Sequence, residues 1–178
     1  PTSSHPVIRQ VRVQGAYPSI HGNKLWKSSR LLIDYLNKNR PSHHKNVIDV
    51  GCGWGGKAIY CAVHLGSERT EGFDLPGVFD PEVPLAFAAE LGVTGCGFRT
   101  GHAERIPYAA GEFDVLFCED VLEHVADPAA VLQECRRVLR SGGLLIALFP
   151  SFRMLDAHHL DRAAAWPGLH YLLSMKTW

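Results

Sequence analysis

Glycines and one carboxylate gather in the segment Asp49-Val-Gly-Cys-Gly-Trp-Gly-Gly56, which continues a short apolar run at 46–50. Glycine lets a backbone pass close to a ligand because no Cβ stands in the way. Gly51, Gly53 and Gly56 also satisfy the dinucleotide pattern G-x-G-x-x-G. The glycines alone therefore leave two alternatives open, a nucleotide site or a tight strand-to-helix turn with no ligand.

A second carboxylate, Asp74, ends the β-like run that starts at Gly72. In an open α/β sheet this position and the glycine segment face the same crevice, at the carboxyl ends of the strands. A carboxylate there can accept hydrogen bonds from both hydroxyls of a ribose. A solvated turn aspartate is the competing interpretation, but the position of Asp74 relative to the glycines favours a nucleoside.

Alternating strands and helices must position these residues. Apolar runs predict strands at 46–50, 72–75, 97–100, 113–118 and 144–149. Helical spacing predicts helices over 23–39, 57–65, 83–91 and from 128 onward, the last capped by Asp127 and followed by a turn at Gly142 or Gly143. This alternation predicts a doubly wound α/β fold with a mostly parallel sheet.

The chain is expected to form one domain in three segments. These are an N-terminal arm and helix at 1–40, a core at 41–150 and a loop and helix at 151–178. We expect the helix before residue 40 to pack over the ligand side of the core.

Composition limits the kinds of partner and the compartment that we expect for this protein. Eighteen basic residues balance eighteen acidic ones, which predicts no general attraction to nucleic acid. No apolar run is long enough for a membrane span, and no secretory signal is visible. Five cysteines without a C-x-x-C pair favour a reduced, cytoplasmic protein. Oligomeric state cannot be predicted from these features.

Four motifs in order resemble the class I, Rossmann-like S-adenosylmethionine-dependent methyltransferases, within the small-molecule group that includes the ubiquinone and menaquinone methyltransferases. The family patterns are D-x-G-C-G-x-G, G-D-A-x-x-L-P-F, F-D-x-V and D-x-L-E-H-V. They match segments that begin at Asp49, Gly101, Phe113 and Asp120. A nicotinamide-dependent oxidoreductase would share the glycines and Asp74, but not the placement of Asp49 or the last motif.

The resemblance implies binding of S-adenosylmethionine and methyl transfer to an O, N or C nucleophile of a small molecule. A domain that binds the cofactor without transferring methyl is the alternative. The cofactor-binding residues that the resemblance implies are Asp49, Gly51, Cys52, Gly53 and Gly55 for the methionine end, Asp74 for the ribose, Leu75, His102, Ala103 and Glu104 around the adenine, and Glu119 near the reactive end.

Two departures from the family are visible. His102 replaces a frequent aspartate, so Glu104 or the backbone must make the adenine contact. The family fold also ends in an antiparallel hairpin of two strands, whereas 150–178 shows no clear strand pair. Either the sequence omits that hairpin or the protein departs from the family.

Histidines supply the candidates for acid–base catalysis, because imidazole takes up a proton near neutral pH. His159 and His170 follow the last predicted strand, where we expect the acceptor pocket. His124 lies in the motif Glu119-Asp-Val-Leu-Glu-His-Val125, where support of the loop is the main alternative. No standard ligand spacing occurs, so we predict no metal site.

Overall fold

The computed structural model describes residue 30, residues 33–39 and residues 45–149. Five strands and three helices follow a short helical segment at 33–39. They are β1 (Asn46–Val50), α3 (Gly56–His64), β2 (Arg69–Asp74), α4 (Glu82–Glu90), β3 (Cys96–Thr100), β4 (Phe113–Glu119), α5 (Pro128–Val138) and β5 (Leu139–Leu148).

The strands form one sheet in the order β3-β2-β1-β4-β5, and every neighbouring pair is parallel. The prediction of a doubly wound α/β fold is therefore confirmed. Strand order reverses between β1 and β4, where Val47 pairs with Val115. In such sheets ligands bind beyond the carboxyl ends of the strands at this reversal.

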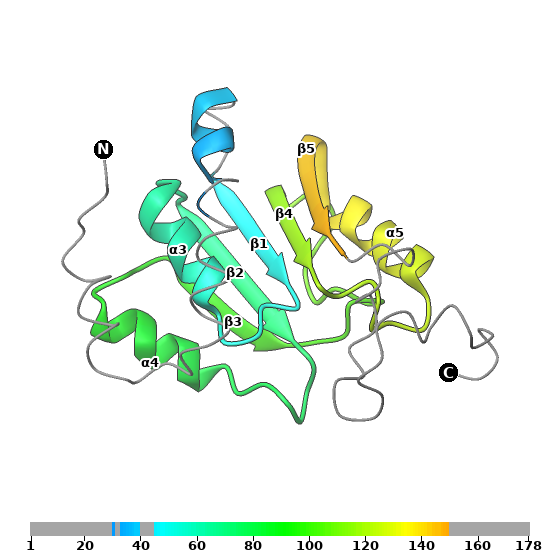
Figure 1. Ribbon diagram of the computed structural model, residues 1–178, viewed down its shortest axis with the longest axis horizontal. Helices are drawn as coiled ribbons and strands as arrows, with labels where there is room; N and C mark the ends of the chain where they lie inside the picture. The colour runs from blue at the N-terminus through cyan, green and yellow to red at the C-terminus, as the bar shows by residue number, and fades with distance from the viewer. Residues whose placement is uncertain (1–29, 31–32, 40–44, 150–178) are drawn as a thin grey trace, which may run out of the picture.

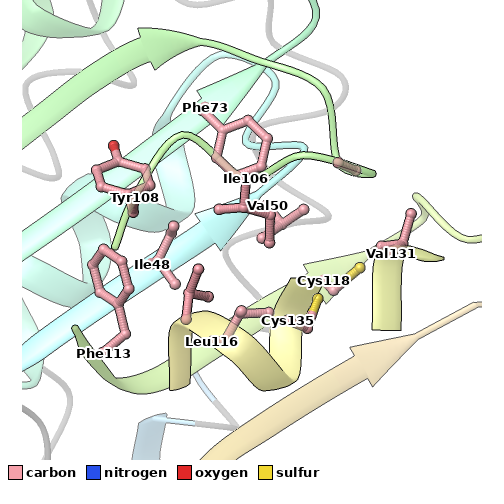
Figure 2. Packing of buried hydrophobic residues seen from close by; sticks show 12 residues of the cluster. Ile48, Val50, Phe73, Ile106, Tyr108, Phe113, Leu116, Cys118, Val131 and Cys135 are labelled. Atoms are coloured by element: carbon pink, nitrogen blue, oxygen red, sulfur yellow. The ribbon is translucent and has the colours of Figure 1, made fainter. Parts of the chain in front are cut away.

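Helices cover both faces of the sheet (Figure 1). Alternate residues of β1 point to opposite faces, so Val47 packs in the cluster that contains Cys61 of α3, while Ile48 packs in the cluster that contains Val131 of α5. Figure 2 shows the α5 face, where Cys118 of β4 and Cys135 of α5 bring their sulfur atoms side by side.

Two strand predictions were wrong in their bounds by more than one residue. β2 begins at Arg69 rather than at 72, because the side chains of Arg69 and Glu71 pair with each other and so keep polar residues in a buried strand. β5 begins at Leu139 rather than at 144, so the glycines that we placed in a turn lie within it. Phe113 of β4 pairs with Leu139, but Val115, two residues further along β4, pairs with Leu144. The extra residues of β5 form an irregularity in which Gly142 has a φ of +76°.

The described part of the helix before residue 40 lies near the amino end of β1, not over the carboxyl ends as we expected. Ile33 and Leu36 are buried in the cluster that contains Val47 and Leu65. Asn37 donates a hydrogen bond to the His64 carbonyl at the end of α3. The two apolar side chains thus find their packing surface at this end of the sheet. In the part of the chain that the structure describes, no helix has the length and apolar character to cross a membrane.

Candidate functional site

A hollow of about 390 Å³ opens beyond the carboxyl ends of the strands. Four loops build its wall, and they follow β1, β2, β3 and β4. The lining residues include Gly51, Asp74, Leu75, His102, Ala103, Glu104, Asp120, Val121 and His124. This is the sheet edge at which the strand order reverses.

The glycine loop between β1 and α3 needs its glycines for different reasons. Gly51, Gly53 and Gly55 all have positive φ, from 53° to 75°. A Cβ on Gly51 would collide with the side chain of Val121, and one on Gly55 would come within 2.5 Å of Pro84. A Cβ on Gly53 would meet nothing within 4 Å. The fold therefore requires a small residue at two of these positions, whereas Gly53 leaves open space in which a ligand can approach the backbone.

Asp74 fastens this loop to the end of β2. Its Oδ2 accepts a hydrogen bond of 2.7 Å from the Gly53 amide, and its Oδ1 accepts one of 2.7 Å from the Leu75 amide. The Phe73 carbonyl accepts further bonds from the amides of Gly51 and Cys52. Because an ionised carboxylate has about four acceptor positions, Asp74 keeps two for a ligand in the hollow.

A buried group of three charged residues lies at the base of the glycine loop, and we call it the Asp49–Lys57–Glu119 triad. Lys57 Nζ lies 2.8 Å from Glu119 Oε2 and 3.7 Å from Asp49 Oδ1. All three side chains are at most 5% exposed. Two acceptors, Asp49 Oδ1 and Glu119 Oε1, are buried and have no hydrogen-bond donor among the described residues.

Burial and charge act in opposite directions in this triad. Burial is the largest influence on Asp49 and raises the pKa of its carboxyl to about 6, although Lys57 partly opposes it. Burial also lowers the pKa of Lys57, but Asp49 and Glu119 together outweigh this effect and raise it. The triad therefore gains one negative charge as Asp49 ionises near pH 6.

The structure brings most of the predicted cofactor residues to one place, although not all face the hollow. Asp49 and Glu119 lie beneath the loop in the triad. The Cys52 side chain packs in the apolar cluster with Ala58 and Phe98, so only its backbone is available to a ligand. His124 lines the hollow. The predicted catalytic residues His159 and His170 lie outside the described residues.

Sequence reasoning missed two residues at this site. Lys57 stands in the first turn of α3, where the helix dipole disfavours a positive charge, and this mismatch was the available signal of a buried anionic partner. Asp120 lines the hollow with a φ of +53°, rare for a residue other than glycine; it begins the D-x-L-E-H-V motif, but the motif assigned it no role. Within residues 45–149 and the short segment before them, no cluster of three metal-ligating side chains occurs.

Comparison with known proteins places this geometry in a family. The chain is 32% identical over 149 residues to the ubiquinone biosynthesis O-methyltransferase of Hahella chejuensis, covering 82% of this chain and 58% of that protein. Among solved structures, the YcgJ protein of Bacillus subtilis matches with a TM-score of 0.59 and 27% identity over 68% of this chain and 49% of the other. Geranyl diphosphate methyltransferase, solved in complex with S-adenosylmethionine, matches with a TM-score of 0.59 and 25% identity over 68% of this chain and 47% of the other.

The chain spans about half the length of these relatives. The family described as the methyltransferase domain matches residues 48–147, which include every strand of the sheet in whole or in part. Since that match covers more than half of the 178 residues, the protein belongs to the methyltransferase domain family, as its motifs predicted.

Proposed function

We propose that this protein binds S-adenosylmethionine in the hollow and transfers its methyl group to an O, N or C nucleophile of a small molecule. The observation that carries the proposal is the pair of buried acceptors without donors, Asp49 Oδ1 and Glu119 Oε1, at the base of a loop with open space over Gly53. An ammonium group is the kind of donor that these oxygens lack. The volume of the hollow is also within the range of small-molecule sites.

Each side of the hollow suits a different part of this cofactor. The triad and the glycine loop would hold the methionine end, through negative charge and exposed backbone. Asp74 would accept hydrogen bonds from the ribose hydroxyls, and Leu75, which is 46% exposed, would lie against the adenine. From the loop that follows β3, Ala103, His102 and Glu104 would contact the edge of the adenine.

When bound, S-adenosylmethionine supplies an electrophilic methyl group, so the protein chiefly has to orient the acceptor. Orientation of this kind can contribute about 7–11 kcal/mol. We propose histidine as the base that takes the acceptor's proton, with His159 first, His170 second and His124, which lines the hollow, third. Replacing the true base by alanine should lower turnover by about 10²–10⁴-fold at unchanged cofactor affinity.

We further propose that the protein works in the cytoplasm without a nucleic-acid partner. All five cysteines are free thiols, as expected in a reducing compartment. Acidic and basic residues balance in number, so there is no overall charge to attract nucleic acid.

The decisive experiment combines calorimetric titration with a transfer assay. We expect S-adenosylmethionine and S-adenosylhomocysteine to bind the folded protein and NAD not to bind. Radiolabelled methyl transfer should then be screened with phenols and other small O, N and C nucleophiles. Tighter binding of NAD would overturn the proposal, and binding without transfer to any acceptor would reduce the protein to a cofactor-binding domain.

A further inference from the structure

Lys57 is the least expected member of the triad, because lysine is almost never fully buried unless it is paired. It lies between Asp49 on β1 and Glu119 on β4, and only 6% of it is exposed. Its Nζ also sits 5.8 Å from the centre of the Phe117 ring, a favourable position for a cation. The lysine is thus held from three sides by the two central strands.

The contacts of Lys57 are unequal in a way that matters for a ligand. The 2.8 Å contact to Glu119 is a hydrogen bond, whereas the 3.7 Å contact to Asp49 is too long for one. Lys57 therefore fixes the position of one carboxylate and gives the other only its charge. Asp49 Oδ1 therefore stays buried beneath the glycine loop without a donor among the described residues.

Other ionisable groups near Asp49 do not replace this charge. Asp74 and Glu119 are negative and disfavour ionisation of Asp49. Burial keeps Cys52 and Cys61 as neutral thiols, because it raises the pKa of both. Cys118 on β4 is likewise held neutral, by its hydrogen bond with Cys135 and by burial. Lys57 is therefore the cation that acts on Asp49 among the described residues that influence it.

We propose that Lys57 is a positioning residue for cofactor binding: its ammonium group anchors Glu119 and keeps Asp49 ionised, so that Asp49 attracts the amino group of the cofactor. This inference rests on the proposed function of the hollow. Without Lys57, two carboxyl groups would share one buried site that excludes water, and one of them would hold a proton at neutral pH. The affinity of such a variant for the cofactor would then depend on pH around neutrality, where the affinity of the wild type does not change with pH.

Removing Lys57 and removing Glu119 should shift the pH midpoint of cofactor binding in opposite directions. A purely structural role would not produce opposite shifts. We would titrate S-adenosylhomocysteine into each variant from pH 4 to pH 10 and locate the midpoint of the acidic loss of affinity. The wild-type midpoint should lie near pH 6, where Asp49 gains its proton. Lys57→Met should move the midpoint up by about two pH units, so that binding at pH 7 is about tenfold weaker and recovers at higher pH. Glu119→Gln should move it below 6, because a neighbouring negative charge is lost.

Lys45→Met is the matched control, since this lysine is exposed and pairs with Glu68 away from the hollow. Its midpoint should equal that of the wild type. Midpoints that stay fixed, or that move in the same direction in both variants, overturn the inference. If Lys57→Met does not fold, Glu119→Gln decides alone, and a midpoint at or above 6 overturns it. Wild-type protein that binds no S-adenosylhomocysteine at any pH overturns the proposed function and this inference together.

Discussion

Two groups of charged residues lie on opposite faces of the sheet, one fully buried and one partly exposed, and they differ in how far their polar atoms are hydrogen-bonded. On the α3 face, the Asp49–Lys57–Glu119 triad leaves two carboxylate oxygens without donors. On the α5 face, Arg137 donates to both oxygens of Glu134 and to the carbonyls of Ile106 and Tyr108. We call this second group the Arg137 network.

The polar groups of the Arg137 network are largely paired by hydrogen bonds. Glu134 also accepts from the Ile106 amide, and the Tyr108 hydroxyl donates to buried Glu71. Together these bonds fasten the loop before β4 to α5 and to β2. A satisfied network of this kind stabilises the fold, whereas unpaired buried acceptors cost free energy until a ligand completes them. We infer from this difference that the triad serves the proposed binding site and the Arg137 network serves the stability of the fold.

The sharpest test lies within the glycine loop, where one glycine faces open space and another faces packed side chains. Gly53→Val should reduce affinity for S-adenosylhomocysteine more than 100-fold, on the order of 3 kcal/mol or more, because its side chain occupies the approach to the backbone. Both variants should lower the thermal midpoint, because both positions have positive φ, but Gly55→Ala should do so without the direct block of the ligand, since its Cβ would clash with Pro84 and Phe98. Normal binding by a folded Gly53→Val variant would show that this loop is not the site.

Asp49→Asn should weaken binding and strengthen the fold at once. Loss of a charge-assisted contact should cost about 1.5–3 kcal/mol of binding, roughly 10–150-fold. The pKa of Asp49 is raised from 3.8 to about 6, so its ionisation opposes folding above that range. The free energy of unfolding of the variant should therefore exceed that of the wild type by up to about 3 kcal/mol at pH 7, and the gap should vanish as pH falls through 6 toward 4. Chemical denaturation at pH 4 and pH 7 measures this gap, and a less stable variant at pH 7 would contradict it.

Asp74→Ala should weaken binding by a similar factor of roughly 10–150 without the gain in stability, because Asp74 holds the loop through the Gly53 amide. Asp80→Ala is the matched control, since Asp80 accepts a comparable backbone bond from Glu82 but does not line the hollow. Calorimetric affinities compare the two. Equal affinities would mean that the end of β2 takes no part in binding.

Arg137→Met should affect stability alone. The side chain is about one third exposed, so solvent screens its ion pair, and we expect a loss of about 1–2 kcal/mol in the free energy of unfolding. Affinity for S-adenosylhomocysteine should change less than about twofold, which is under 0.5 kcal/mol. A large loss of affinity in a fully folded variant would erase the distinction between the two groups.

Local patterns in the sequence predicted much of the fold. The apolar run at 46–50 and the cap at Asp127 are local signals, and β1 and α5 begin where these signals place them. The glycine loop and Asp74 were likewise placed together correctly, because parallel strands end at one edge. The start of β2 was missed because the polar side chains of Arg69 and Glu71 find partners that are distant in the sequence, Glu112 and Tyr108.

The triad could not be derived from the sequence for the same reason. Lys57 meets Glu119 across 62 positions of the chain, and the packing of α3 against the paired strands β1 and β4 brings them together. Sequence motifs named two of its members as cofactor residues, and the only local sign of the third was the unfavourable place of Lys57 in the first turn of α3.

The pairing of β1 with β4 also has a kinetic consequence. It joins Val47 to Val115 at the centre of the sheet, so a long loop of chain must close before these strands gain any contact. Non-local parallel pairing of this kind makes folding slow. The hollow exists only after β4 has docked beside β1, so a partly folded chain offers its ligand nothing to bind. We therefore expect the ligand to slow unfolding while leaving the refolding rate unchanged.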